Sequence, residues 1–179
     1  MSENKIPFTE NTRLAKRIAA GVVALSILVI GPVKLKGLRN EAMDVFKFGT
    51  SKEYTASVYT DLTRAADSAN VLAGLSGSEK LKKLAEKLKK EDDPADMLEI
   101  FDELKTEADD VYTAFTRTNP GEAEMRDANG AIKQITSAFN TITSDTFWSY
   151  ADKFNSARKG FPASLLAMLS GAKKLPEGK

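Results

Sequence analysis

The chain contains neither cysteine nor histidine among its 179 residues. Without cysteine it can form no disulfide and perform no thiol chemistry. Without histidine it lacks the usual general base near neutral pH and the commonest metal ligand. Histidine-dependent triads, zinc hydrolase sites and haem ligation by histidine are therefore excluded. Carboxylate chemistry, a serine–lysine pair and hard-cation binding by oxygen remain, and we expect a protein that is not an enzyme and holds no cofactor.

The chain also has almost no excess of charge of either sign. Its 26 basic residues balance 25 acidic ones and leave a formal net charge of +1. Such a chain has no overall field that attracts nucleic acid, and it contains no P-loop or nucleic-acid-binding motif, so we expect no nucleic-acid partner. Only six prolines and eleven glycines interrupt the helical patterns, and no strand-like alternation is present. The predicted fold class is all-α.

One long apolar run is present, over residues 18–33, with basic residues on both sides. As a helix it spans about 24 Å, slightly less than a hydrocarbon core of about 30 Å, but the flanking bases can extend their charges outward. We predict a transmembrane signal anchor over 18–33, preceded by a short polar segment over 1–17. A cleaved signal peptide and a buried helix of a soluble domain are the alternatives. The sequence after Pro32 offers no small-residue cleavage site for a signal peptidase.

The orientation of this anchor is not fixed by its flanking charges. Basic residues precede and follow the run in similar numbers, so the positive-inside rule gives almost no preference. A short N-terminal segment with a downstream domain most often leaves that domain outside the cytoplasm. We therefore expect a single-pass membrane protein whose domain is extracytoplasmic.

Apolar residues recur at helical spacing through the rest of the chain. One stripe runs from Leu35 to Phe46, and a second, from Tyr54 to Leu72, follows a break at residues 48–51. A short helix is predicted over 79–90. The next two helices should begin at Asp93-Pro94-Ala95-Asp96 and at Asn119-Pro120-Gly121-Glu122, since each combines an N-cap acceptor, a proline and an acid.

The last long helix contains a phase slip at residues 143–146, which predicts a kink, a local rewinding or a break. It should end before Gly160, which can supply a left-handed cap, and a short apolar helix follows. These lengths predict an antiparallel four-helix bundle over residues 34–170, with long first and last helices, after the N-terminal transmembrane helix. Residues 171–179 form a polar tail.

The predicted helix 79–90 carries six lysines, whereas residues 91–110 carry ten acids against one lysine. A hairpin would lay these two arms side by side as solvated faces that compensate each other. The alternative is a basic helix that binds lipid or an anionic polymer. The residues that would make that contact are Lys82, Lys83, Lys87, Lys89 and Lys90.

Other candidate contacts are aromatic or apolar. Trp148 either packs at the core or bundle edge, or contacts a ligand or partner. The terminal helix would cap the base of the bundle or touch the bilayer through Leu165, Leu166, Met168 and Leu169. Asp92, Asp93 and Asp96 lack the spacing of a calcium loop and are better explained by helix capping, so no metal site is predicted. Side chains that could pair across helices are Arg39, Asn40, Arg64, Asn70 and Asn155.

Three short motifs occur in order along the chain. They are Leu38-Arg-Asn-Glu-Ala42 after the anchor, Asp61-Leu-Thr-Arg-Ala-Ala-Asp-Ser-Ala-Asn-Val-Leu72, and Phe154-Asn155 before Gly160-Phe161-Pro162. Their order and spacing, from about Val33 to Leu169, resemble the LemA family of bacterial membrane proteins. The chain departs from the family at Gly49-Thr50, which interrupts a longer helix there, and in lacking prolines within the first helix. The resemblance implies an anchored antiparallel four-helix bundle and no catalytic residues.

We therefore expect a non-enzymatic, membrane-anchored scaffold or interaction protein of the bacterial cell envelope. Its partners would be the lipid bilayer, through residues 18–33, and a protein. One rival is a lipid-binding or anionic-polymer-binding module that uses the basic helix 79–90. The other is a carboxylate-based hydrolase, which needs two acids that converge in one pocket with shifted pKa values.

Overall fold

The computed structural model describes residues 12–50, 57–160, 162–169, 171 and 173–178. Over these residues the chain forms helices and no strand, which confirms the predicted all-α class. The helices are α1 Thr12–Phe48, α2 Val58–Ser76, α3 Glu79–Lys90, α4 Pro94–Thr116, α5 Glu122–Thr143, α6 Phe147–Ala157 and α7 Ala163–Leu169.

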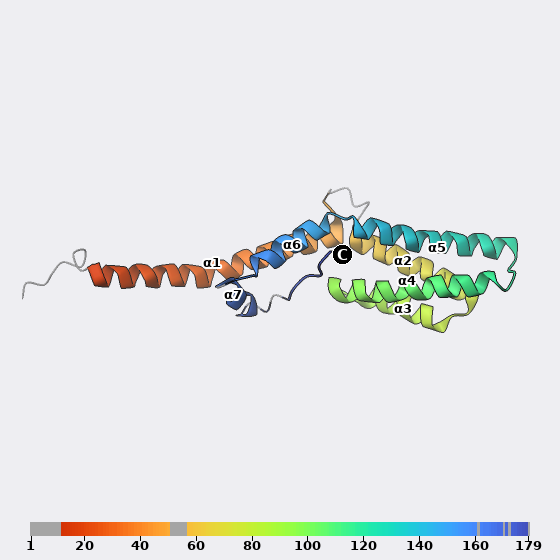
Figure 1. The fold of residues 1–179 in the computed structure, drawn as a ribbon, viewed down its shortest axis with the longest axis horizontal. Coiled ribbons are helices and arrows are strands. Elements are labelled where there is room, and N and C mark those ends of the chain that lie inside the picture. Colours follow the sequence, from red (N-terminus) through yellow and green to blue (C-terminus); the bar gives the residue numbers. More distant parts are fainter. Residues whose placement is uncertain (1–11, 51–56, 161, 170, 172, 179) are drawn as a thin grey trace, which may run out of the picture.

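The molecule is elongated, with its helices arranged in two tiers along the long axis (Figure 1). In one tier, α6 and α7 pack against the second half of α1. In the other, α2 contacts α3, α4 and α5, while α4 also contacts α3 and α5. α2 extends beyond the end of α1 and α5 lies beyond the start of α6, so two interrupted rods connect the tiers (Figure 1).

Local chemistry explains where α2, α3 and α4 begin. Ser57 caps α2, Ser78 caps α3 and Asp93 caps α4, each by accepting a backbone N–H with its side chain. Such acceptors satisfy amide groups that have no partner in the first helical turn. α4 starts at Pro94, as predicted, with proline in the first turn,. Gly77 separates α2 from α3 with a φ of 74°, a left-handed conformation that glycine adopts without strain,.

The predicted start of α5 is wrong by two residues. Asn119 does not cap the helix; it takes a left-handed φ of 53° in the turn after α4, and Pro120 stays outside the helix. Gly121 is the N-cap, and its N–H donates to Glu124 Oε2 at 3.1 Å. Asparagine tolerates the left-handed conformation better than most residues, so the turn uses Asn119 for its backbone conformation and the helix begins at Glu122.

Both long rods are interrupted close to the predicted positions. α1 ends at Phe48, the first residue of the break predicted at residues 48–51. α5 is separated from α6 by residues 144–146, within the predicted phase slip. α1 runs unbroken through Pro32. Ser57 links the start of α2 to the end of α1 across the first interruption, since its buried hydroxyl donates a hydrogen bond to the Lys47 carbonyl at 3.0 Å. Tyr54, predicted to start the second stripe, lies outside the described residues.

The core follows the predicted helical stripes. Buried residues on the two rods include Phe46, Leu62 and Ile135, and Phe101 and Leu104 contribute from α4. Where the two tiers meet, the ring of Phe46 packs edge to face on Phe147 of its own tier, with centroids 5.2 Å apart, and on Tyr59 of α2 in the other tier, at 6.4 Å. Buried aromatic pairs of this geometry add to the stability that burial alone provides. The joint between the tiers is therefore part of the core.

Candidate functional site

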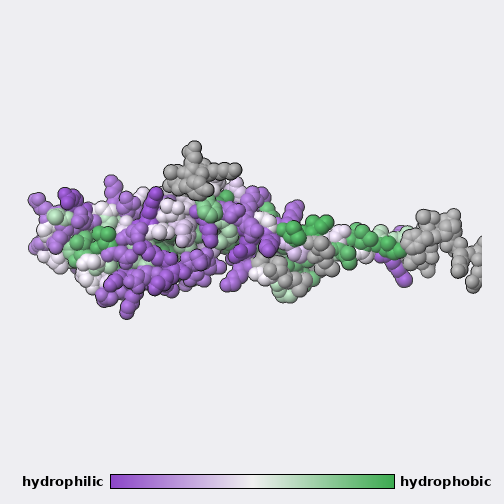
Figure 2. All heavy atoms as spheres, turned by 180° about the vertical axis from the view of Figure 1, so that it is seen from behind, coloured by the Kyte–Doolittle hydropathy of each residue, from purple (hydrophilic) through white to green (hydrophobic). Residues whose placement is uncertain are grey.

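The first half of α1 is apolar and exposed. It is the one helix in the described part of the chain that is long and apolar enough to cross a membrane, and only 7% of its most apolar window is buried inside the molecule. A helix from the core of a soluble domain would be mostly buried. Figure 2 shows this apolar surface leading away from the polar body of the molecule. Its exposed large side chains are Ile18, Val22, Val23, Leu25, Ile30 and Val33.

α7 packs against α1 where the apolar run ends. Leu166 and Ala167 are buried against Leu35 in a small cluster of their own, separate from the main core. Gly31 makes the close approach possible, because a Cβ at this position would clash with the Leu166 side chain. Leu165 and Met168 remain exposed, at 42% and 72%. The α7 helix thus carries an outward apolar face at the end of the candidate span.

The three leucines predicted as contacts in this helix have different environments. Leu165 is exposed and Leu166 is buried, and the side chain of Leu169 lies outside the described residues. Only Leu165 therefore presents a described surface for a lipid or a partner.

A hollow of about 540 Å³ lies beside this contact. It is lined by the end of the apolar run at Pro32 and Val33, by residues one and two turns further along α1, by Asp93 at the start of α4, and by the segment that follows α7. The α1 residues are Lys36, Arg39 and Asn40, and the later segment contributes Gly171 and Lys173. Three cations therefore face one carboxylate, and the hollow carries an excess of positive charge.

α3 belongs to the other tier and lies away from the exposed apolar half of α1 (Figure 1), although its last turn, with Lys87, ends beside Glu91, which also feels the charge of Lys173. Leu81, Ala85 and Leu88 bury the apolar face of α3 in the core, so the helix has no apolar face left to insert into a bilayer. The predicted pairing of its charges with the acidic arm is confirmed between Lys80 and Glu107. The bond to Glu107 raises the pKa of Lys80.

The five lysines predicted as contacts are all on the exposed face of α3. Lys89 forms an ion pair with Asp67 on α2. The other four form no ion pair with a described residue and are exposed: Lys82, Lys83, Lys87 and Lys90. α3 therefore presents charge to solvent and no exposed apolar stripe.

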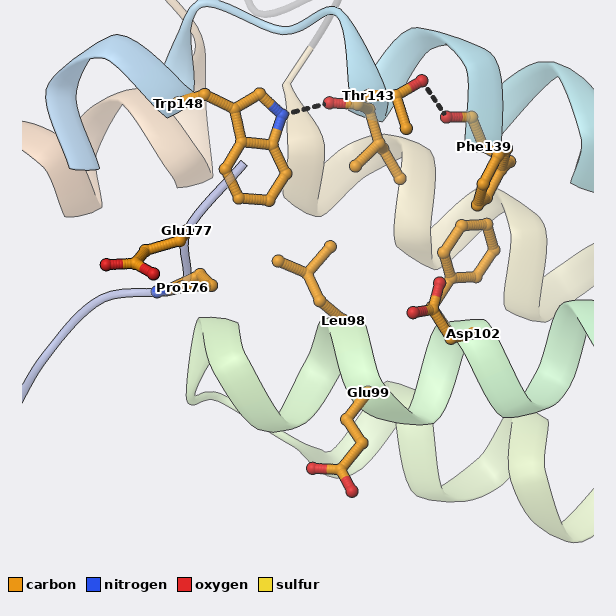
Figure 3. A pocket seen from close by; sticks show the side chains of 10 residues that line it. Leu98, Glu99, Asp102, Phe139, Thr143, Trp148, Pro176 and Glu177 are labelled. Atoms are coloured by element: carbon orange, nitrogen blue, oxygen red, sulfur yellow. Dashed lines mark hydrogen bonds between the residues drawn. The ribbon is translucent and has the colours of Figure 1, made fainter. Parts of the chain in front are cut away.

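Trp148 lines a cavity of about 170 Å³ where α4, α5, α6 and the C-terminal segment meet (Figure 3). Its indole N–H donates to the Ile142 carbonyl at 2.6 Å, and its ring packs on Phe147 with centroids 5.2 Å apart. Figure 3 shows the indole facing Leu98 across the cavity, while Glu99 points away. Trp148 thus packs at the edge of the core, the first of the two predicted alternatives, and its indole N–H is bound within the molecule.

The C-terminal segment makes a buried contact with the core that the sequence did not predict. Leu175 is buried in the main core, and the side-chain amide of Asn155 binds its backbone. Pro176 and Glu177 close one side of the Trp148 cavity. Of the polar residues predicted to pair across helices, Asn155 alone is buried, and it pairs with this segment instead. The sequence predicts only a polar tail over residues 171–179.

Four acids of α4 line a hollow with Lys80: Asp102, Glu103, Glu107 and Asp110. In the part of the chain that the structure describes, no group of three or more His, Cys, Asp or Glu side chains is placed to hold a metal ion. Burial raises the pKa of Asp61, while Arg64 opposes the shift and Asp145 adds to it. Asp145 itself caps α6, since its Oδ1 accepts the Phe147 N–H at 2.7 Å. Asp145 therefore has a structural role at the start of α6, and the raised pKa of Asp61 follows first from its burial.

Of the three acids predicted as helix cappers, Asp92, Asp93 and Asp96, Asp93 caps α4. Asp93 Oδ1 accepts the Ala95 N–H at 3.0 Å, as the capping prediction requires. Glu91 Oε1 accepts the N–H groups of Asp92 and Asp93, and these two bonds lower the pKa of Glu91. The acidic cluster thus organises the turn between α3 and α4.

Comparison with known proteins gives no relative: no family model, no curated protein and no solved structure matches the chain.

Proposed function

We propose that the protein is a single-pass, membrane-anchored helical interaction protein of the bacterial cell envelope, with no catalytic role. One observation carries the proposal: α1 is apolar and exposed in its first half and contributes to the buried core in its second half, without a break at Pro32. A helix of 37 residues extends about 55 Å,. This length is enough to cross a bilayer of about 30 Å and still enter a folded domain.

The continuity of α1 gives the anchor a mechanical role. Leu35, Ala42 and Phe46 bury the same helix in the domain, so the domain is held at a fixed angle to the span and is not joined to it by a flexible linker. The tier formed by α2, α3, α4 and α5, the distal tier, then lies away from the membrane along the axis of α1. Such an arrangement suits a protein that presents a rigid surface to a partner.

The finer architecture belongs to the same proposal. Each interrupted rod, α1 with α2 and α5 with α6, is equivalent to one long helix, and α3 and α4 complete an antiparallel four-helix bundle. This arrangement is the one that the resemblance to the LemA family implies, and we propose that the chain is a divergent member of that family. The domain lies outside the cytoplasm.

Single cysteines test the anchoring and the orientation, because the natural chain has no cysteine. Ser137→Cys places a thiol on an exposed face of α5, and Ser26→Cys places one within the apolar run. In intact bacterial cells a membrane-impermeant maleimide should label Ser137→Cys and leave Ser26→Cys unlabelled. Recovery of the chain in the soluble fraction would contradict the anchoring. Labelling of Ser137→Cys only after lysis would contradict the extracytoplasmic orientation.

The interaction role has its own test on the distal tier. Val71 is half-exposed on α2, and a photo-reactive residue in its place should produce a protein adduct of defined mass in living cells. The same residue at Ser26 is the control and should react with lipid. Adducts to lipid alone at both positions would contradict a protein partner for the distal tier.

A further inference from the structure

We propose that the hollow between α1 and the segment after α7 binds the headgroup of an anionic phospholipid from the adjoining leaflet. The inference rests on the membrane anchoring proposed above and identifies a specific lipid partner for the membrane end of the domain. Lys36, Arg39 and Lys173 supply the positive charge of the site.

Position along α1 is the first argument. The hollow begins at Pro32 and Val33, the last residues of the apolar run. Lys36 and Arg39 follow Val33 by about 5 and 9 Å along a helix axis. The polar headgroup layer of a leaflet is roughly 5 to 8 Å thick. When the apolar run fills the hydrocarbon core, the cations of the hollow therefore lie at the depth of the lipid phosphates.

The charges in the hollow are not neutralised by the protein. No described carboxylate forms an ion pair with Lys36, Arg39 or Lys173. Asp93, the one acid among the described lining residues, already accepts an N–H through its Oδ1 as the cap of α4. Glu91 lies close enough to feel the charge of Lys173, but its Oε1 is held by two backbone N–H groups.

Arg39 provides a donor without a protein partner. Its Nε is buried and has no hydrogen-bond partner in the structure, which is costly for a polar atom unless a ligand satisfies it. A guanidinium can donate two parallel hydrogen bonds to the oxygens of a phosphate. A phosphodiester bound by the guanidinium of Arg39, with Lys36 and Lys173 as flanking point charges, would balance the excess charge of the hollow.

The surroundings of the hollow favour a lipid as the source of the phosphate. Ile30 and Val33 on α1 are exposed, and Leu165 and Met168 on α7 present a second apolar surface at the same end of the span. Acyl chains attached to the bound headgroup can lie along these side chains. Cationic pockets beside transmembrane helices bind anionic headgroups in this way, whereas a free phosphate would make no use of the apolar surfaces.

Lipid retention by the full chain tests the proposal. The protein is reconstituted in vesicles of equal parts phosphatidylglycerol and phosphatidylcholine and extracted in mild detergent, and the retained lipids are identified by native mass spectrometry. The natural chain should retain phosphatidylglycerol preferentially. Since a juxtamembrane cation contributes about fivefold to anionic-lipid affinity, Lys36→Gln with Arg39→Gln should lower the preference by about 25-fold.

The matched control removes the same charge elsewhere. Lys82→Gln with Lys83→Gln takes two cations from the exposed face of α3, remote from the hollow, and should leave the preference unchanged. Lys173→Gln provides a second test outside the helices, in case the Arg39 substitution disturbs α1, and should lower the preference by about fivefold. Equal retention of both lipids by the natural chain, or an equal loss in the α3 control, would overturn the proposal.

Two further results separate the possible failures. If inorganic phosphate in large excess displaces the lipid completely, the site binds free phosphate and the lipid assignment is overturned; persistence of the lipid supports it. If the chain fails to float both with vesicles of equal parts phosphatidylglycerol and phosphatidylcholine and with vesicles of phosphatidylcholine alone, the membrane anchoring itself is overturned. Flotation with both kinds of vesicle but no lipid preference overturns only the headgroup site.

Discussion

Two hydrogen bonds join the side-chain amide of Asn155 on α6 to the backbone of Leu175 near the C-terminus. Asn155 Nδ2 donates to the Leu175 carbonyl at 2.9 Å, and the Leu175 N–H donates to Asn155 Oδ1 at 3.1 Å. Both residues are buried, with exposures of 4% and 3%. The amide therefore binds both the N–H and the C=O of one backbone residue and holds the C-terminal segment against the core.

Asn155→Leu should release this segment. The substitution is close in size and removes both hydrogen bonds, which leaves a buried N–H and a buried C=O unsatisfied at roughly 1–3 kcal/mol each. The segment can escape that cost by detaching, so the loss in unfolding free energy should be limited to about 2 kcal/mol, the value of burying Leu175. Trypsin should then cleave faster after the exposed Lys173 and Lys174, as followed by mass spectrometry.

The control for this change is Asn140→Leu, at an exposed asparagine on α5. It should leave both the unfolding free energy and the rate of tryptic cleavage near their natural values. If Asn155→Leu were cleaved no faster than Asn140→Leu, the amide pairing would not be what holds the segment.

The parts of the fold that follow from neighbouring residues could be predicted from the sequence. The start of α4 depends on Asp93 and Pro94, which act within one helical turn,. The interruption between α5 and α6 shows as a slip in the helical period, because a continuous helix cannot keep both apolar stripes on one face. In each case the signal and the structure it specifies lie within a few residues of each other.

The parts that depend on distant contacts could not be predicted. Leu175 stands alone among polar and charged neighbours, so no periodicity signals its burial. Its position depends on Asn155, 20 residues away. The cationic hollow likewise combines α1 with Lys173, and no local pattern connects them. The error at Asn119 has a related cause: the same residue type can cap a helix or take a left-handed turn.

Phe46→Ala should destabilise the joint between the two tiers. Phe46 is fully buried and packs on Phe147, with Tyr59 at a centroid distance of 6.4 Å. Loss of a buried phenyl ring leaves a cavity and typically costs about 3–5 kcal/mol. Chemical denaturation followed by circular dichroism measures the change. Phe48→Ala is the matched control two residues along α1, at a side chain that is 52% exposed, and should cost about 1 kcal/mol or less.

Gly31→Leu should displace α7 from α1. Any side chain at residue 31 meets Leu166, and a leucine is too large for that flexible side chain to accommodate by rotation alone. Hydrogen exchange of the 163–169 peptide in the reconstituted protein should become faster, because these amides lose the packing that protects them. Gly21→Leu makes the same chemical change where a Cβ would meet no atom within 4 Å. Protection of α7 should be the same in Gly21→Leu as in the natural chain; equal exchange in both variants would mean that α7 does not depend on this contact.

Asp61→Asn should reduce the dependence of stability on pH. Burial raises the pKa of Asp61 above its ordinary value of 3.8, so the folded state binds the proton more tightly than the unfolded state. The free energy of unfolding therefore falls as the pH rises from 3.8 through the folded pKa, and above that range the ionised carboxylate lowers stability,. The natural chain should gain stability relative to Asp61→Asn when the pH is lowered from about 7 to about 3. Thermal melts of both proteins at the two pH values measure this difference.

Asp44→Asn, at an exposed residue of α1, makes the same substitution without burial. If Asp44→Asn showed the same shift with pH, or if Asp61→Asn showed none, burial at the foot of α2 would not be the cause.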